Sequence, residues 1–354
     1  MSVRKTKAAV LETINAPLVV EELEIPDLEY GQVLVRIYST GICGKQLGQI
    51  AGLEGEDPFL PHLLGHEGGG VIVEIGGGVS KVKEGEHVVV HWRKGTGIEG
   101  GIPRYKRSDG IVTSGFLSTF NEYAVVSENR VTAIPDDIPF EVAALMGCAV
   151  TTGLGLVNND AKVKLGESAA VMGCGGVGMN VIQGLAMVSA YPIIAIDISE
   201  SKLSIASEMG ATHTINPNES DVREEIQKIL GSKKLDVFVE CTGLVSLIEL
   251  AYDLTTPAGG RTVLVGRPKF DQDLTIHSFL SQFGGPDDSG KILKYSQGGQ
   301  TVPELDIPRY IRLYRQGKIK LDSLITHRYR LEDINSALDE IRKGDVGRCL
   351  ISMD

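Results

Sequence analysis

The chain has 354 residues, of which 42% are hydrophobic and 23% charged, a composition typical of a globular protein with room for two domains. Its formal net charge of −11, with no long basic run, argues against nucleic acid and anionic membrane surfaces as partners. No apolar run approaches the roughly 18 residues that cross a bilayer, and no apolar signal core follows the basic residues near the start, so we expect a cytoplasmic protein.

Residues 1–150 predict a mostly β domain. Four apolar runs of β type, separated by glycine-rich and charged turns, lie at residues 33–40, 71–76, 87–92 and 121–126. Helical periodicity is scarce until residues 140–157, where the texture of the sequence changes.

Short apolar runs then alternate with helical segments. The apolar runs are residues 168–173, 192–199, 235–243 and 261–266, and the helical segments are residues 176–190, 200–211 and 244–255. Strands that alternate with helices predict βαβ units and a parallel sheet. Two more helices, at residues 302–318 and 331–344, and a strand at residues 348–352 complete the pattern.

The stretch GCGGVG, residues 173–178, has the spacing G-x-G-x-x-G directly after a predicted strand and at the start of a helix. This context favours a dinucleotide site over a plain glycine-rich turn, because a helix N-terminus offers free N–H groups and a favourable dipole to a pyrophosphate. Gly173 permits the tight turn, Gly175 the approach of the pyrophosphate, and Gly178 the close packing of helix on strand. Gly176 and Val177 complete the predicted phosphate loop.

Asp197 ends the next predicted strand, about 20 residues beyond the motif, where a carboxylate accepts hydrogen bonds from the ribose hydroxyls. Its charge would repel a 2′-phosphate, so the sequence predicts NAD rather than NADP. Lys202 follows in the next helix, where it either reaches the same ribose or is a solvated lysine.

A second site is predicted around GHEGGG, residues 65–70, where four glycines make the backbone permissive. The cysteines are Cys43, Cys148, Cys174, Cys241 and Cys349. Their odd number and wide spacing argue for reduced thiols rather than a disulfide framework. Taken singly, a buried cysteine is usually a small hydrophobe. Cys43, His66 and Cys148 together, ahead of a dinucleotide fold, predict a catalytic zinc site with an open fourth position.

Three segments resemble the zinc-dependent alcohol dehydrogenases of the medium-chain dehydrogenase/reductase superfamily. GHEGGGVIVEIGGGVSKVKEGEHVVV is similar to the zinc signature of the family, LMGCAVTTGLG to its third-ligand segment, and residues 306–351 to its C-terminal region, above all in formaldehyde/glutathione-type and related bacterial members. The resemblance covers nearly the whole chain. It implies a GroES-like catalytic domain, residues 1–149 and 297–354, a Rossmann domain that binds NAD, residues 150–296, and a homodimer or homotetramer.

Matched residue by residue, the resemblance implies that Cys43, His66 and Cys148 hold one catalytic Zn²⁺ per chain. Glu67 matches an acid that lies beside the metal and ligates it transiently. Zinc lowers the pKa of a bound hydroxyl, and an alkoxide is a better hydride donor than an alcohol. Two thiolates leave the site formally neutral, so an alkoxide can bind and a carbonyl product can leave. The glycines after His66 would then let the backbone pass close to the coenzyme.

Further positions match coenzyme and substrate contacts of the family. Thr152, Val265 and Gly266 match nicotinamide contacts, and Arg348 matches a pyrophosphate contact. Trp92 matches a wall of the substrate pocket, although an ordinary core aromatic is an equal alternative.

The sequence departs from the family between residues 91 and 120. Many relatives hold a second, structural zinc there with four closely spaced cysteines, and this segment has none, so a structural zinc of that kind is excluded. Basic residues cluster there instead: Arg93, Lys94, Arg104, Lys106 and Arg107. They are either solvated surface or, if the segment covers the active site, a patch for an anionic substrate or a partner subunit.

A second departure follows the first ligand. Relatives commonly have a hydroxyl two residues after this cysteine, which starts a proton relay, then an aspartate, and often a histidine further on. Here the residues are Gly44, Lys45 and Gln46, and no such histidine follows. Lys45 moves the proton itself if burial lowers its pKa, or binds a carboxylate, phosphate or polyol oxygen of the substrate, or simply extends to solvent.

The predicted function is hydride transfer between NAD and an alcohol or carbonyl substrate, with a polar alcohol, polyol or sugar-type hydroxyl as the expected class. Two alternatives stay open: an aldehyde dismutase that retains its coenzyme, and a non-catalytic regulatory protein that binds NAD. The intact Cys-His-Cys set favours an enzyme, whereas the missing relay hydroxyl keeps the regulatory alternative open.

Overall fold

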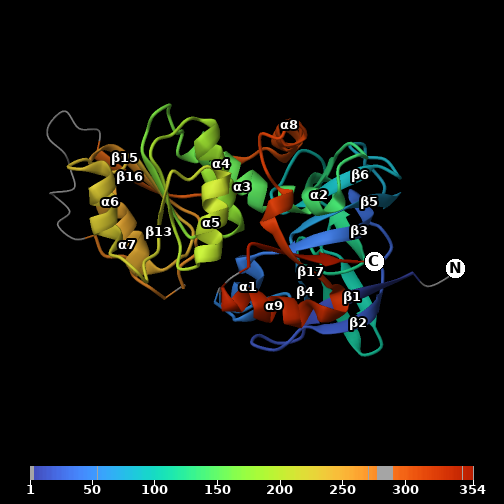
Figure 1. The fold of residues 1–354 in the computed structure, drawn as a ribbon. Helices are drawn as coiled ribbons and strands as arrows, with labels where there is room; N and C mark the ends of the chain where they lie inside the picture. The colour runs from blue at the N-terminus through green and yellow to red at the C-terminus, as the bar shows by residue number, and fades with distance from the viewer. Residues whose placement is uncertain (1–3, 54, 270, 277–289, 345, 354) are drawn as a thin grey trace. The chain divides into compact units, whose positions relative to one another are not determined.

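The structure is a computed structural model that describes residues 4–53, 55–269, 271–276, 290–344 and 346–353 (Figure 1). Contacts divide the chain into two compact units. Unit 1 comprises residues 1–151 and 302–354, and unit 2 comprises residues 152–301. Both changeovers lie a few residues further along the chain than the boundaries predicted from the sequence.

Unit 1 is built from two β structures. Strands β1, β2, β7, β8 and β4 close a small barrel, and a seven-stranded sheet has the order β10-β6-β5-β3-β18-β17, with β9 also paired to β3. The strands are β1 Lys5–Leu11, β2 Val19–Glu24, β3 Gln32–Ile42, β4 His62–Leu63, β5 Glu67–Ile75, β6 His87–His91, β7 Arg104–Arg107, β8 Gly110–Thr113, β9 Tyr123–Ser127, β10 Val131–Ala133, β17 Ile325–Arg330 and β18 Arg348–Ser352. The four β-type runs predicted from the sequence form β3, β5, β6 and β9.

Few helices accompany these strands. They are α1 Gly44–Ile50, α2 Phe140–Met146, α8 Pro303–Arg315 and α9 Ile334–Lys343 in unit 1, and α3 Ala149–Gly155 at the changeover to unit 2. Within the described residues, no single helix is both long and apolar enough to cross a membrane; α2 and residues Ala149–Asp160 reach that length only as a pair, with a 46° bend between them.

The glycine run in β5 allows close packing inside unit 1. A Cβ atom on Gly69 would overlap the carbonyl oxygen of Phe140 in α2, and one on Gly70 would overlap the carbonyl oxygen of Arg36 in β3. The close neighbours of these two glycines are therefore a helix and a strand of the same unit. These contacts give the two glycines a packing role inside unit 1, and the expectation that the glycines around His66 let the backbone pass close to the coenzyme stays a prediction.

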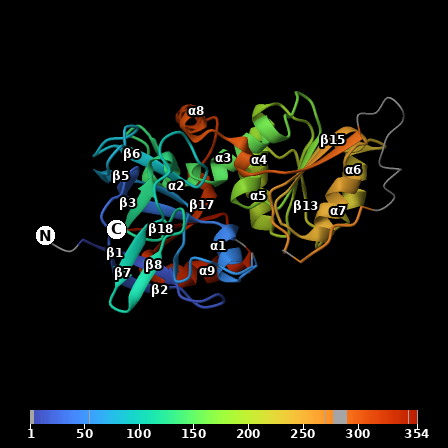
Figure 2. The same cartoon turned by 180° about the vertical axis from the view of Figure 1, so that it is seen from behind.

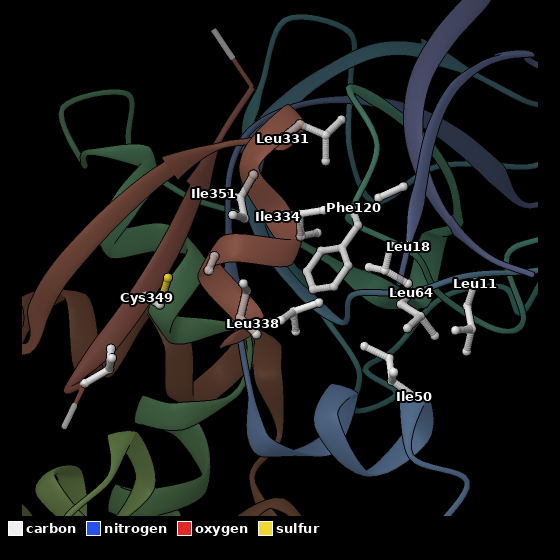
Figure 3. Packing of buried hydrophobic residues seen from close by; sticks show 14 residues of the cluster. Leu11, Leu18, Ile50, Leu64, Phe120, Leu331, Ile334, Leu338, Cys349 and Ile351 are labelled. Carbon is white, nitrogen blue, oxygen red and sulfur yellow. The ribbon is translucent and has the colours of Figure 1, made fainter. Parts of the chain in front are cut away.

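A buried apolar cluster fixes the elements that carry the site residues of unit 1 (Figure 3). Ile50 at the end of α1, Leu338 of α9 and Cys349 of β18 all belong to it, and each is at most 3% exposed. Burial of such side chains stabilises the fold by about 1.5–3 kcal/mol each. The start of β18 and the whole of α1 are thereby held on one common core.

Unit 2 is a parallel six-stranded sheet with the order β13-β12-β11-β14-β15-β16. Its elements are β11 Ala169–Met172, α4 Gly176–Met187, β12 Ile193–Ile196, α5 Glu200–Met209, β13 His213–Ile215, α6 Val222–Leu230, β14 Val237–Glu240, α7 Val245–Leu254, β15 Ala258–Leu264 and β16 Gly290–Tyr295. Figures 1 and 2 show α4 and α5 on one face of this sheet and α6 and α7 on the other. The doubly wound arrangement confirms the predicted fold class for this unit.

The sequence analysis did not single out β13, α6 or β16. Asp221 caps α6 by accepting a hydrogen bond from the N–H of Glu224, which is the local signal for a helix start in this stretch. Strand β13 has only three residues and β16 is partly exposed, so neither presents the continuous apolar run that marks a buried parallel strand.

Candidate metal and dinucleotide sites

Three side chains predicted as metal ligands meet in unit 1. Cys43 directly precedes α1, His66 directly precedes β5, and Cys148 lies between α2 and α3. Their ligand atoms all lie within 4.8 Å of one another, and Nε2 of His66 is 3.2 Å from Sγ of Cys148. Each residue stands at the end of a regular element, so the packing of β3, β5 and α2 brings the three together.

The donor set fits zinc. Two sulfurs and one imidazole nitrogen are borderline-soft ligands that one tetrahedral ion reaches at about 2.3 Å and 2.0–2.1 Å. Three protein ligands leave a fourth position open, which is the arrangement of a catalytic rather than a structural zinc. The Cys-His-Cys geometry therefore supports the predicted catalytic metal.

The two thiols of the cluster differ in their acidity. A hydrogen bond from Cys148 and the nearby His66 stabilise the thiolate of Cys43, and together they outweigh burial and hold its pKa well below the usual range. The same hydrogen bond, with burial, raises the pKa of Cys148. Both cysteines would bind a cation as thiolates.

Gln46 contacts two of the three predicted ligands, Cys43 and His66. The sequence analysis missed this contact. Gln46 is the third residue of α1 and only 1% exposed. Its Oε1 accepts a hydrogen bond from the N–H of Cys43 at 3.0 Å, and its Nε2 meets Nδ1 of His66. One amide therefore links the backbone of the first ligand to the ring of the second. The available sequence signal was a polar residue placed one helical turn after a ligand.

Glu67 points to Arg348 instead of joining the three-ligand cluster. The two form a buried ion pair, in which an Arg348 Nη donates to Oε1 of Glu67. Burial raises the pKa of Glu67, and the guanidinium opposes that effect. Oε2 of Glu67 and Nε of Arg348 are buried and have no hydrogen-bond partner in the described part of the chain. The transient metal contact of Glu67 and the pyrophosphate contact of Arg348 stay predictions.

Lys45 and Trp92 are both partly buried in unit 1. Lys45 is the second residue of α1 and follows Cys43 closely along the chain. Trp92 directly follows β6, and the guanidinium of Arg93 lies over its ring at 6.0 Å from the centroid. Neither residue belongs to the fully buried core, so a core-aromatic role does not explain Trp92.

The basic residues of segment 91–120 do not form one patch. Arg104, Lys106 and Arg107 belong to β7, where Arg107 pairs with Glu12, Glu21 and Asp109. Lys94 instead pairs with Glu99 at 2.7 Å. Acidic neighbours thus balance both residues, and the solvated-surface interpretation fits Lys94, which is exposed, whereas Arg107 is largely buried among its carboxylate partners.

Three carboxylates hold the segment where relatives carry a structural zinc. We call Glu99, Glu128 and Glu304 the carboxylate clasp. Glu128 accepts hydrogen bonds from the backbone N–H groups of residues 80, 81 and 98 at 2.6–2.8 Å. Glu99 accepts from the side chains of residues 129 and 130, and Glu304 accepts from the N–H of residue 96 at 3.0 Å.

In unit 2, the predicted phosphate loop joins β11 to α4. Gly173 has φ +92°, a conformation that favours glycine, and a Cβ on Gly178 would overlap the carbonyl oxygen of Gly173. A Cβ on Gly175 would meet nothing within 4 Å, so the backbone at the start of α4 faces open space. Gly176 and Val177 form the first turn of α4 beside this space. The loop therefore has the shape that a pyrophosphate requires.

Asp197 directly follows β12 and is tied to the same loop. Its Oδ2 accepts from the N–H of Cys174 at 2.7 Å, and its Oδ1 accepts from the N–H of Ser199 at 3.0 Å. Each carboxylate oxygen keeps a lone pair for another donor. Lys202 lies on α5 and is partly buried close to this loop, since its charge acts on Cys174.

Two of the remaining predicted coenzyme contacts of unit 2 follow the end of a strand, and the third lies inside a helix. Val265 and Gly266 directly follow β15, and both N–H groups donate to the carbonyl oxygen of Glu240. In a parallel sheet the carboxyl ends of strands share one edge, where nucleotides bind. Thr152 in α3 is 6% exposed, and its Oγ1 has no hydrogen-bond partner among the described residues. An unmet buried hydroxyl is consistent with a group that awaits a ligand.

Comparison with known proteins finds two family models that match the chain. The model of the zinc-binding dehydrogenase family matches residues 176–284, and that of the alcohol dehydrogenase GroES-like domain matches residues 29–136. S-(hydroxymethyl)glutathione dehydrogenase of Paracoccus denitrificans is 32% identical, with 98% of this chain and 99% of the relative covered.

Two solved structures have similar folds. A zinc-binding-domain alcohol dehydrogenase protein from Burkholderia ambifaria superimposes with a TM-score of 0.89 at 29% identity, with 100% of both chains covered. Benzyl alcohol dehydrogenase from Acinetobacter calcoaceticus superimposes with a TM-score of 0.88 at 28% identity, with 99% of this chain and 100% of that chain covered.

Proposed function

Because the chain belongs to the zinc-dependent alcohol dehydrogenase family, whose members are zinc- and nicotinamide-dependent oxidoreductases, we propose that it transfers a hydride between NAD and a polar alcohol. The observation that carries the substrate class is Lys45, a cationic side chain in the first turn of α1, two residues after the ligand Cys43. The relative from Paracoccus is named for S-(hydroxymethyl)glutathione, a polar alcohol, which supports the same class.

The residues around the metal site of unit 1 have different proposed roles in the reaction. Cys43, His66 and Cys148 would hold the zinc ion, which would supply a Lewis acid that lowers the pKa of a bound hydroxyl. The two thiolates balance the charge of the metal ion. Gln46 orients the ring of His66, and Arg348 holds Glu67 in a buried ion pair beside the ligands.

Preference for NAD over NADP is proposed from Asp197. Its carboxylate is anchored by two backbone N–H groups at the end of β12, so it cannot turn away from an incoming ribose without losing both hydrogen bonds. A 2′-phosphate would meet this negative charge, whereas ribose hydroxyls would donate to it.

Lys45 is proposed to hold the substrate or to move its proton. A positioned general base contributes about 10²–10⁴-fold to the rate, so Lys45→Met should lower kcat by that factor if Lys45 takes the proton. If Lys45 only binds the substrate, KM should rise while kcat stays unchanged. In both cases the zinc content should stay at one per chain.

The test is a substrate panel with zinc-replete protein and either NAD or NADP. Polyols and S-(hydroxymethyl)glutathione should be oxidised with a higher kcat/KM than benzyl alcohol, and NAD should be preferred. Benzyl alcohol as the best substrate would overturn the polar class. A protein that binds NAD but turns over no alcohol or aldehyde would support the regulatory alternative, and aldehyde dismutation without added coenzyme would support the dismutase.

Assembly and location complete the proposal. Strand β16 is an edge of the unit 2 sheet, and its Ile292 and Tyr295 are 49% and 41% exposed, which favours a homodimer or homotetramer that covers them. Sedimentation of the Ile292→Lys variant should show a smaller assembly than that of the wild type. The five cysteines are free, which is consistent with the proposed cytoplasmic location.

A further inference from the structure

The amide of Gln46 contacts two of the three zinc ligands at once. Its carbonyl oxygen accepts from the backbone N–H of Cys43 at 3.0 Å, and its NH₂ group faces Nδ1 of His66. The other ring nitrogen of His66, Nε2, faces Sγ of Cys148 at 3.2 Å, inside the ligand cluster. Nε2 is therefore the nitrogen placed for the metal, and Nδ1 is left to Gln46.

The hydrogen-bond donors and acceptors around this amide do not match once zinc binds. A neutral imidazole that ligates through Nε2 carries its proton on Nδ1 and must donate it. The backbone N–H of Cys43 is also a donor. The two donors face opposite ends of the amide, one at Oε1 and one at Nε2, so the oxygen can face only one of them although it has two lone pairs. Rotating the amide by 180° only moves the mismatch from His66 to Cys43.

We propose that Gln46 is a positioning residue that limits how tightly the site retains zinc, because two donors compete for its one carbonyl oxygen. The competition between the two donors matters because Gln46 is buried. Gln46 is 1% exposed, so bulk water does not replace the missing acceptor. Partners that orient a zinc-bound histidine typically change metal affinity by about 10–100-fold. The inference rests on the zinc centre and is independent of the proposed alcohol.

The decisive variant is Gln46→Glu, because a carboxylate provides one acceptor oxygen for each donor. Zinc affinity of the full-length protein, measured by competition with a chromophoric chelator, should rise about 10-fold or more. Gln46→Leu offers no acceptor and should bind zinc about 10-fold more weakly than wild type. The expected order of affinity is thus glutamate, glutamine, leucine.

Gln49→Glu is the matched control for charge. Gln49 lies one turn further along the same short helix, is only partly buried, and makes no side-chain hydrogen bond to His66 among the described residues, so its replacement adds the same charge to the helix. It should leave zinc affinity within about twofold of wild type, since a charge that reaches solvent is screened. A Gln46→Glu variant no tighter than wild type, or one matched by Gln49→Glu, would overturn the proposal.

A second measurement uses the wild-type protein alone. Nitrogen-15 NMR of labelled histidines reports which ring nitrogen carries the proton. His66 should carry it on Nε2 in zinc-stripped protein and on Nδ1 after zinc is added. An Nδ1–H ring already present in stripped protein would overturn the proposal, because zinc would then cost the amide no hydrogen bond. Neither readout involves an alcohol, so failure here is separable from failure of the proposed function.

Discussion

The metal cluster and the carboxylate clasp lie in the same unit but solve opposite problems. At the metal cluster, Cys43, His66 and Cys148 gather donor atoms that attract a cation from outside the chain. At the clasp, Glu128 satisfies both of its oxygens with backbone N–H groups of the same unit. The metal cluster is complete only when a cation binds to it. The carboxylate clasp is already complete, because its hydrogen-bond partners belong to the chain.

The difference between the two regions lies in whether a position is left open for a further ligand. Three gathered metal donors remain chemically useful because a fourth position stays open. A carboxylate saturated by backbone donors fixes a loop but keeps no position for chemistry. Segment 91–101 is therefore held by charge and hydrogen bonds that the described part of the chain itself provides.

The largest expected effect comes from removing a donor of the metal cluster. Cys43→Ala should lose zinc and lower kcat/KM by about 10³-fold or more, because the Lewis acid contributes several kcal/mol. Coenzyme affinity should be kept, since the predicted phosphate loop lies in unit 2. Metal analysis and steady-state kinetics measure both effects.

Cys349→Ala is the control for that experiment. Cys349 is 1% exposed in the apolar core of the same unit and is not part of the cluster. It should keep one zinc per chain. Zinc retained by Cys43→Ala, or two zinc ions bound tightly by wild type, would contradict the division between the two regions.

Removing one acceptor from the clasp should destabilise the protein without affecting zinc. In Glu128→Gln an NH₂ group replaces one oxygen of a buried side chain, so a part-buried backbone N–H at residue 80, 81 or 98 loses its acceptor. The apparent free energy of unfolding in urea should fall by about 3 kcal/mol. The exposed Glu22→Gln, which breaks a surface pair with Lys5, should change it by less than about 1 kcal/mol. Equal losses in the two variants would refute a special role for Glu128.

The clasp should also weaken in acid. Partial burial opposes ionisation of Glu99, but hydrogen bonds from Lys94, Asn129 and Arg130 outweigh it and lower its pKa to about 2. The pKa of glutamate in an unfolded chain is about 4.3. The stabilisation of the folded state by ionised Glu99 is therefore complete above that pH and is lost as the pH falls toward 2. With allowance for solvent screening, Glu99→Gln should be less stable than wild type by about 1 kcal/mol at pH 7.

The pH dependence of that difference is the discriminating measurement. Urea denaturation of wild type and Glu99→Gln should converge between about pH 4.3 and pH 2. A difference that stays constant over this range would mean that Glu99 acts through packing and not through its charge.

The smallest effect is expected at the outer end of the clasp. Lys94 is 63% exposed, and its ion pair with Glu99 faces solvent. Lys94→Ala should therefore change stability by less than about 0.5 kcal/mol and be indistinguishable from wild type at 1 M salt. A loss as large as that of Glu99→Gln would show that Lys94, and not Arg130, is the main partner of Glu99.

Sequence reasoning could predict both sites because their residues stand at the ends of regular elements. Cys43 and His66 directly precede α1 and β5, and Gly173 directly follows β11, so motif and element boundary coincide. The predicted zinc and nicotinamide cofactors are confirmed by the family comparison and the Cys-His-Cys geometry. The individual coenzyme and proton-transfer roles of Lys45, Lys202 and Arg348 remain predictions.

What the sequence could not show depends on packing between distant segments. Gln46 meets His66, and Glu67 meets Arg348, only after β3, β5 and β18 pair. The clasp was invisible for the same reason, since Glu128 and the N–H groups that it binds are far apart in the chain. The missing four-cysteine motif in residues 91–120 shows that a structural zinc of that kind does not hold this segment. Only the folded structure shows that the carboxylate clasp does.

The glycine run of β5 has a consequence for natural variation. Because a Cβ on Gly69 would overlap the backbone of α2, the helix that ends just before Cys148 would have to move. A Gly69→Ala allele would alter no donor atom, yet it would displace the third ligand. A survey of sequence variants that checks only the three ligands would therefore score such an allele as harmless, although its defect lies in the metal centre.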